Sequence, residues 1–321
     1  MNLKKSKICW QTAVNSLYKV EPCTVKGCDL GFSGVVWTGG GGYWAGCLRY
    51  TIRSYMKHTV SKQNRALLSE LVRTDFKLRY QGSVLGYAWS LLRPLFLFII
   101  LYVVFTKFIK IGNTVPHYPV YLLLGIVLWQ FFTDMTNQSL MSVVARGDLI
   151  RKIRIPRWMI VLTSSVSALI SLGLNMVIIL VLMAINHVPI SLSVVWLPVA
   201  ILEIYIFAVG LSLFLAAAYV KYRDLSFIWE VIVQAGFYLT PVIYPLSAVS
   251  NVQLQKLILL NPMAQSIQDA RNVLVTKETI TIAEVYGSSA ARLIPFTISI
   301  LVLILGIIFF KKEAKYFAEN I

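Results

Sequence analysis

The chain has 321 residues, of which 57% are hydrophobic and only 14% are charged. An average soluble domain is about 45–50% apolar and about 25% charged, so this chain has too few charged groups to cover a soluble body of its size. The composition excludes a disordered chain, a collagen-like or coiled-coil rod and an ordinary cytosolic enzyme, and it predicts an integral membrane protein. The formal net charge of +16 is found in nucleic-acid-binding proteins, but also in membrane proteins, whose cytoplasmic loops collect Lys and Arg.

Six segments are long and apolar enough to cross a bilayer as helices, which takes about 20 residues. Residues 158–185 and 293–310 contain no charged side chain. The other four are interrupted, and they are 86–106 (Arg93, Pro94), 118–142 (Asp134), 194–220 (Glu203) and 225–248 (Glu230). Between the last two spans the apolar pieces are too short to cross, and we predict re-entrant helices at about 243–272, a geometry allowed where the backbone is buried in protein. The predicted fold is an all-α integral membrane protein with six transmembrane helices, an N-terminal amphipathic interface helix and re-entrant helices between spans five and six.

The Lys and Arg residues alternate in sequence with the predicted spans. After Met56, seventeen of them fall on the side that holds both ends of the chain, and six fall on the opposite side. By the positive-inside rule this distribution predicts a multi-pass protein of the cytoplasmic membrane with both termini in the cytoplasm. No single basic patch is left over, so we expect no nucleic-acid partner.

The first 55 residues differ from the rest of the chain. All four cysteines, Cys9, Cys23, Cys28 and Cys47, lie there together with a GGGG run. Their spacings do not form the paired C-x₂-C units of zinc sites, and we expect no metal. We interpret 1–55 as an N-terminal extension, non-conserved or a misassigned start, because Met56 opens a sequence typical of a short basic cytoplasmic arm. Residues 56–85 then form this arm and the interface helix, and 86–321 form the transmembrane domain.

Two basic segments on the predicted cytoplasmic side have alternative readings. In residues 66–80 apolar side chains recur at helical spacing opposite Arg and Lys, which predicts an amphipathic helix at the membrane surface. Such a helix is either a membrane anchor or a docking surface for a cytoplasmic partner. The loop 145–157 either only sets the topology or carries a short helix beginning at Gly147–Asp148, on which a partner acts.

Three carboxylates lie inside predicted spans, where an ionisable group is a functional hypothesis by default. Asp134, Glu203 and Glu230 lie at different distances from the cytoplasmic ends of their spans, which disfavours a proton relay. We expect Glu230 near the interface, and Asp134 and Glu203 either paired with Arg93 or facing a wet cavity.

Aromatic residues are dense in 86–106 and around 237–244. Interfacial belts and lipid-facing packing account for most of them; the alternative is a channel whose rings stack on sugar faces. The sequence has no G-x-x-x-x-G-K-[ST], G-x-S-x-G or H-E-x-x-H motif, so we expect no catalytic residue and no cofactor on this chain.

A run of motifs in fixed order carries a resemblance to a known family. Residues 71–96 read LVRTDFKLRYQGSVLGYAWSLLRPLF, followed by RGDLIRKIRIPRW at 146–158, VKYRDL at 220–225, FYLTPVIYP at 237–245 and LNPM at 260–263. Over about 250 residues from near Arg65, the chain resembles the ABC-2 type permeases that export polysaccharides such as O-antigen, capsule, teichoic acid and related polyol phosphates. Residues 1–55 have no counterpart in that pattern.

The resemblance implies a homodimer paired with two copies of a separate ATP-binding subunit, which holds ATP and Mg. It also implies a lipid-linked polysaccharide as substrate and a channel between the sets of spans one and five. The positions that would couple to the ATPase are Arg73, Lys77, Arg146, Asp148, Leu149, Ile150, Arg151 and Lys152. The aromatic positions that would line the glycan channel are Tyr87, Trp89, Phe96, Tyr102, Phe237, Tyr238 and Tyr244.

Three other functions remain open. An ABC-2 permease for a small hydrophobic compound or lipid would share the fold and the partner. A membrane-embedded transferase acting on a lipid-linked sugar would need convergent carboxylates or histidines at one membrane face. A proton-coupled secondary transporter would show internal repeats.

Overall fold

A computed structural model describes residues 62–80, 88–110, 115–148, 156–189 and 192–317. The chain divides into two units, Met1–Thr59 and Val60–Ile321, and every described residue belongs to the second. Within these residues the structure consists of helices and loops without a strand. The predictions for residues 1–55, for Tyr87 and for Leu149–Lys152 lie outside the described residues.

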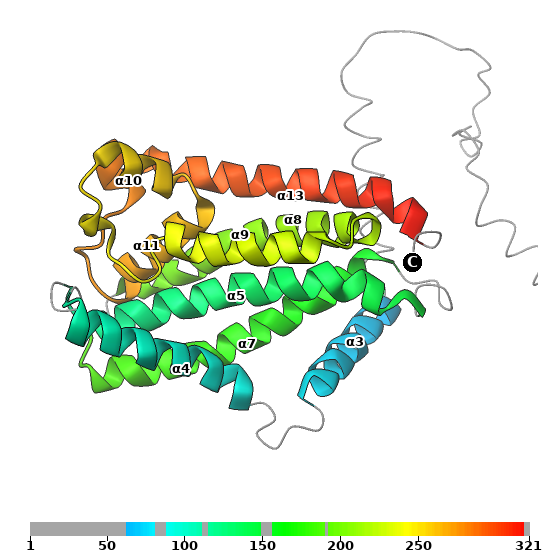
Figure 1. Cartoon of the computed structure of the whole chain (residues 1–321), viewed down its shortest axis with the longest axis horizontal. Helices are drawn as coiled ribbons and strands as arrows, with labels where there is room; N and C mark the ends of the chain where they lie inside the picture. Colours follow the sequence, from blue (N-terminus) through cyan, green and yellow to red (C-terminus); the bar gives the residue numbers. More distant parts are fainter. Residues whose placement is uncertain (1–61, 81–87, 111–114, 149–155, 190–191, 318–321) are drawn as a thin grey trace, which may run out of the picture. The chain divides into compact units, whose positions relative to one another are not determined.

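Five apolar helices in the described ranges are long enough to cross a membrane (Figure 1). They are α4 (Ala88–Val103) with the π-helical η1 (Val104–Phe108), α5 (Tyr118–Ala145), α7 (Trp158–Ile185), α8 (Leu197–Lys221) with the preceding η3 (Leu192–Trp196), and α13 (Leu293–Glu313) between η5 (Ser289–Arg292) and η6 (Ala314–Tyr316). They confirm five of the predicted spans, and α7 has the predicted bounds. The described part of the chain is therefore all-helical, and its long apolar helices make it a multi-pass membrane protein.

The predicted span 225–248 is too long. Helix α9 (Leu225–Leu239) has 15 residues, a length of about 22 Å against a hydrocarbon core of about 30 Å. It ends because proline disfavours helical backbone at the residue before it, and Thr240, which precedes Pro241, is extended with φ −85° and ψ 139°. The chain then continues in short helices.

The segment between α9 and α13 consists of η4 (Leu246–Ala248), α10 (Val252–Leu259), α11 (Pro262–Leu274) and α12 (Ile282–Tyr286). Asparagine side chains begin two of these helices. Asn251 accepts from the backbone N–H of Gln253 at 2.9 Å, and Asn261 accepts from that of Met263 at 3.0 Å. These bonds satisfy amide donors that the first turn of a helix leaves free.

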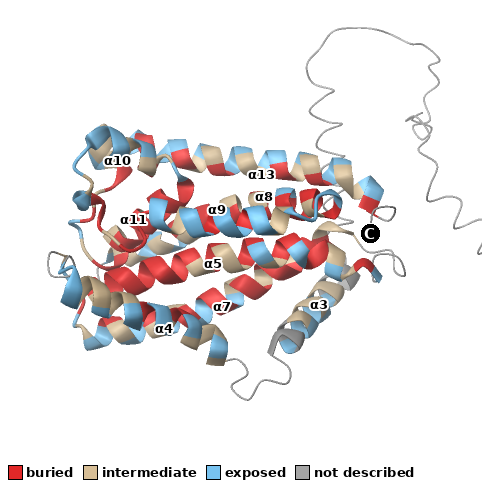
Figure 2. Cartoon of the chain, viewed as in Figure 1, coloured by how far each residue is buried: buried red, intermediate tan, exposed pale blue. Residues whose placement is uncertain are grey.

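Helix α5 lies at the centre of the unit and α4 at its edge. Figure 2 shows α5 largely buried, whereas α4 and α13 leave much of their length exposed. Pro94 inside α4 removes the hydrogen bond that the Ser90 carbonyl would accept. Asn175 of α7 replaces this bond, because its side-chain N–H donates to the Ser90 oxygen at 3.3 Å. Proline within a membrane helix is tolerated where a neighbouring helix supplies such a donor.

Small residues allow α8 and α13 to pack closely. A Cβ at Gly306 of α13 would lie 2.1 Å from the carbonyl oxygen of Gly210 on α8, so only glycine fits without moving the two backbones. Close approach at small residues is how membrane helices gain packing energy where lipid provides no hydrophobic drive between them.

Candidate functional site

The amphipathic helix α3 (Lys62–Tyr80) confirms the helix predicted over 66–80. Its Asp75 forms an ion pair with Arg146, at 2.5 Å between carboxylate oxygen and guanidinium nitrogen, and both side chains are mostly buried. The Ser167 hydroxyl of α7 donates to the second oxygen of Asp75 at 3.2 Å. One carboxylate therefore ties α3 to the end of α5 and to α7.

The predicted coupling residues separate into buried and exposed positions. Arg146 is held by Asp75, whereas Arg73 and Lys77 on α3 and Asp148 beyond α5 are exposed. The sequence prediction did not include Asp75. Its signal is an acidic residue that lies between basic residues in a mostly basic helix, in the run RTDFK.

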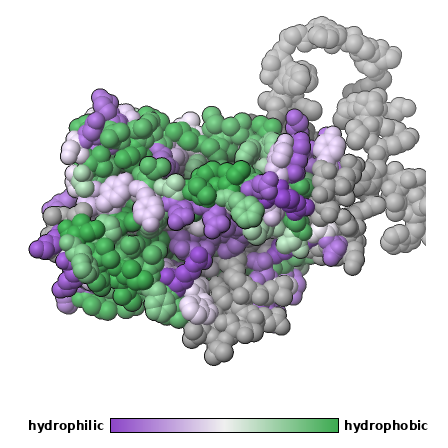
Figure 3. Space-filling view, in the orientation of Figure 1, coloured by the Kyte–Doolittle hydropathy of each residue, from purple (hydrophilic) through white to green (hydrophobic). Residues whose placement is uncertain are grey.

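The exposed side of α5 carries a polar stripe in the middle of a membrane-spanning helix. The stripe consists of Gln130, Thr133, Asp134, Asn137 and Gln138, which are half-buried or exposed while most of the helix is buried. Their spacing of three and four residues places them on one face of the helix. Figure 3 shows apolar surface over α4 and over α9 and α13, with a polar band over α5 between them.

Asp134 has the partner that the sequence predicted. Its carboxylate lies 3.8 Å from the guanidinium of Arg93 on α4 and accepts from the Gln130 side-chain amide at 2.7 Å. The Arg93 side chain is 71% exposed, so the charge pair is open on this face. An uncompensated charge in hydrocarbon is costly, and an exposed pair in a span indicates an aqueous or polar lining.

The other two carboxylates do not join Asp134. Glu230 is exposed on α9, and Glu203 is buried on α8 beside Ser266 and Asp269 of α11. One oxygen of Glu203 has no hydrogen-bond partner in the described part of the chain. Of the two alternatives for Glu203, pairing with Arg93 is not the one found, because Arg93 lies beside Asp134. The three groups therefore form no convergent acid–base set of the kind that a transferase or proton relay needs.

The predicted channel aromatics also fall into two groups. Trp89 and Phe96 of α4 and Tyr238 of α9 are exposed, at 47%, 52% and 62%. The other three described rings make internal contacts: Tyr102 stacks on Phe98 at 5.7 Å, Phe237 meets Trp129 at 6.1 Å, and the Tyr244 hydroxyl donates to the Leu239 carbonyl at 3.3 Å. Both α4 and α9 pack against α5, so the exposed rings flank the helix that carries the polar stripe.

Arg271 of α11 is a fully buried cation that the sequence prediction counted only as a loop charge. Its guanidinium donates to three carbonyl oxygens, those of Tyr121 at 3.1 Å, Pro241 at 2.5 Å and Val242 at 2.6 Å, and it lies 3.7 Å from the centre of the Tyr121 ring. Gly125 leaves room for it, because a Cβ there would lie 2.3 Å from a guanidinium nitrogen. Arg271 thus joins the start of α5, the segment after α9 and α11.

Five apolar helices long enough to cross a membrane, a polar stripe inside one of them and a charge-anchored amphipathic helix describe a multi-pass membrane protein. The chain belongs to the ABC-2 type transporter family, whose model matches residues 66–275. It is 30% identical over 261 residues to the O-antigen export system permease protein RfbA of Myxococcus xanthus, covering 81% of this chain and 96% of that protein. Two proteins of the same name from Klebsiella pneumoniae are 29% identical over 254 residues and 27% identical over 258 residues, each covering 79% of this chain and 94% of the relative.

Proposed function

We propose that the chain is the permease subunit of an ABC exporter that moves a lipid-linked polysaccharide of the O-antigen type across the cytoplasmic membrane. The observation that carries the proposal is the similarity to O-antigen export permeases over nearly their whole length, with 96% of the Myxococcus protein covered. The polar stripe with its flanking aromatic rings supports a polar cargo, because sugars present hydroxyl groups to polar side chains and C–H faces to rings.

In-frame deletion of the gene in its host tests this proposal. Surface polysaccharide should disappear and lipid-linked polysaccharide should accumulate on the inner side, and a plasmid copy should restore export. Unchanged surface polysaccharide in the deletion strain, together with altered efflux of a small lipophilic compound, would contradict the choice of cargo.

A separate ATP-binding subunit, in two copies that hold ATP and Mg, would drive the transport. We infer that it docks on the exposed face of α3, which includes Arg73 and Lys77, and on the segment that begins at Asp148. The Asp75–Arg146 ion pair supports this arrangement, because it links α3 to the end of α5, so that a movement of one helix is transmitted to the other. Co-purification of an ATPase with the tagged protein, lost in Asp148→Lys, is the direct test.

We also infer that the transporter is a homodimer with six spans per subunit. Helix α9 then acts as the short fifth span, α10 and α11 are re-entrant, and both termini lie in the cytoplasm. Two copies that face each other across their α4 and α9 edges would close the polar stripes into one path, rimmed by Trp89, Phe96 and Tyr238. Crosslinking of cysteines placed along α9 tests this face, and labelling of terminal tags tests the orientation.

A further inference from the structure

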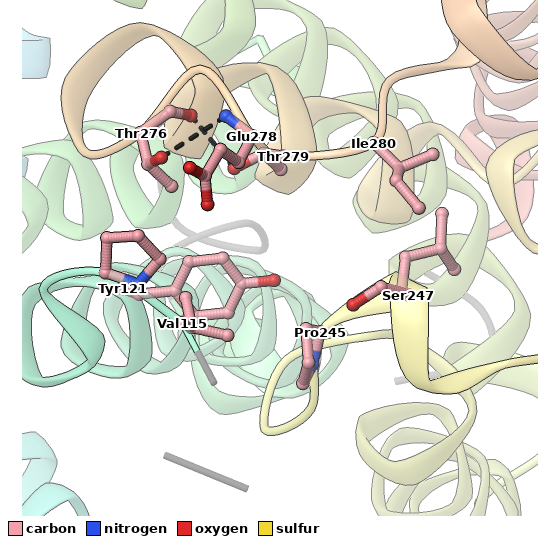
Figure 4. A pocket seen from close by; sticks show the side chains of 10 residues that line it. Val115, Tyr121, Pro245, Ser247, Thr276, Glu278, Thr279 and Ile280 are labelled. Atoms are coloured by element: carbon pink, nitrogen blue, oxygen red, sulfur yellow. Dashed lines mark hydrogen bonds between the residues drawn. The ribbon is translucent and has the colours of Figure 1, made fainter. Parts of the chain in front are cut away.

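A small polar pocket lies at the opposite end of α5 from the Asp75–Arg146 pair (Figure 4). It has a volume of about 70 Å³ and lies between the chain just before α5, the turn after α9 and the loop between α11 and α12. The 28 residues of α5, at about 1.5 Å per residue, place the pocket about 40 Å from that ion pair. In the proposed orientation the pocket therefore faces the outside of the cell.

The groups that line the pocket suit a ring with several hydroxyls. Hydroxyls come from Ser247, Thr276 and Thr279, a carboxylate comes from Glu278, and apolar faces come from Tyr121 and Pro245. Figure 4 shows the Glu278 carboxylate and the Ser247 hydroxyl directed into one space from two different loops, with the Tyr121 ring below Glu278 and beside Ser247. Carboxylates accept hydrogen bonds from ligand hydroxyls, while rings pack on the C–H face of a sugar.

The same lining disfavours ions. Glu278 is the only charged residue among the ten that line the pocket. One carboxylate is too few for a calcium site, which takes six to eight oxygen ligands with several carboxylates among them. A phosphate would meet the negative charge of Glu278, and the neighbouring Lys277 ammonium is not part of the lining, since it donates to the Ser193 hydroxyl at 2.9 Å.

The loop that carries Glu278 is fixed before any ligand binds. The Glu278 backbone N–H donates to the Thr276 hydroxyl oxygen at 3.2 Å, and the Thr279 hydroxyl donates to the Thr276 carbonyl at 3.1 Å. The Asn272 side chain donates to the Thr279 carbonyl at 3.3 Å. The opposite wall is fixed too, because Tyr121 is held against Arg271. Preorganised walls reduce the entropy that binding costs.

We propose that this pocket binds one neutral sugar unit of the polysaccharide as the polymer leaves the membrane. The proposal rests on the export function above and adds a cargo class to it: a neutral, hydroxyl-rich glycan rather than a polyol-phosphate polymer. A volume of about 70 Å³ is below the usual range for ligand pockets, so the pocket has room for part of one ring and not for a longer stretch of the polymer.

The cysteine distribution allows a direct test. All four natural cysteines lie in residues 1–55, so Ser247→Cys, in a full-length chain whose four cysteines are replaced by serine, gives one reactive thiol in the pocket. The matched control is Ser250→Cys, which is exposed three residues further on and does not line the pocket. The rate of maleimide labelling is measured on the purified protein, with any subunit that accompanies it.

The probe is the host's own surface polysaccharide, freed of lipid by mild acid, and the comparison polymer is poly(glycerol phosphate). The polysaccharide should slow labelling of Ser247→Cys about tenfold at about ten times its Kd and leave Ser250→Cys unchanged. Glu278→Gln, added to Ser247→Cys, should raise the concentration needed about tenfold, because it removes charge-assisted hydrogen bonds.

Equal labelling with and without the polysaccharide, or protection by the phosphate polymer instead, overturns the proposal. The control variant separates pocket binding from general coating of the surface. Failure of the pocket proposal can be told apart from failure of the export function. If the deletion strain loses surface polysaccharide but the polysaccharide does not protect Ser247→Cys from labelling, only the proposal of sugar binding in the pocket is refuted.

Discussion

Alanine at position 306 tests the close approach of α8 and α13. The new Cβ would lie 2.1 Å from the Gly210 carbonyl oxygen and 2.9 Å from its carbon, where ordinary contacts are 3.4–4 Å. Both obstructing atoms are backbone, so the two helices must move apart by more than 1 Å along their contact. Overpacking of this kind costs about 1–3 kcal/mol, and the separation also weakens the dispersion contacts of neighbouring side chains.

A matched glycine shows the effect of alanine without the clash. A Cβ on Gly173 of α7 meets nothing within 4 Å, and Gly→Ala in an open helix position stabilises by up to about 1 kcal/mol. Gly306→Ala should therefore be less stable than Gly173→Ala by about 1–3 kcal/mol, because the gain in helix propensity is common to both and cancels. The free energy of unfolding in an SDS titration of the purified protein measures this difference. Equal stability of the two variants would refute the packing argument.

Four further predictions concern the proposed transport cycle and its scaffold. Asp75→Arg should uncouple ATP hydrolysis from export by repelling Arg146, and the double variant Asp75→Arg/Arg146→Asp should recover part of the coupling. Both are tested by measuring export and ATPase activity on the same samples. A double variant that couples no better than Asp75→Arg alone would contradict the role of this ion pair. Trp89→Ala should slow polysaccharide export several-fold while protein level and oligomeric state stay normal. An unchanged export rate would show that the Trp89 ring does not contact the polymer. Arg271→Met, which removes the donor to three carbonyl oxygens, should destabilise the fold by about 3 kcal/mol or more. In SDS titration Arg271→Lys should fall between the natural protein and Arg271→Met, and a fully stable Arg271→Met contradicts the assignment. Deletion of residues 2–55 should leave expression and export intact, and loss of export in the deletion strain would give that segment a role.

The apolar length of the spans was predictable because hydropathy alone determines it. Residues 158–185 form α7 without any change of bounds, and 118–142 extends to Ala145. The end of the span predicted at 225–248 was not predictable from hydropathy, because apolar residues continue through Val242 and Ile243 although the helix ends at Thr240–Pro241. The local Pro signal was present in the sequence, and the apolar residues after it outweighed it.

The site was less predictable than the fold, because its parts meet only in three dimensions. The pairing of Asp134 with Arg93 was foreseen, since two opposite charges in neighbouring spans have few other partners. The roles of Asp75 and Arg271 were not, because their partners are 71 and up to 150 residues away in the chain. Backbone carbonyls, which hold Arg271, carry no sequence signature at all. The polar stripe on α5 was visible only as single polar letters until burial showed that they share one face.

The Arg271 contacts also impose an order on biosynthesis. The ribosome synthesises the Tyr121 segment and the Pro241–Val242 segment before α11. The carbonyl oxygens of these segments therefore have no Arg271 guanidinium to accept from until α11 has been made. Until α11 is made, the segment after α9 and the start of α5 are not joined by the Arg271 guanidinium. Helix α11 therefore completes the packing at this end of the helices that precede it, and a nascent chain that stalls before residue 271 lacks the three hydrogen bonds that join these segments.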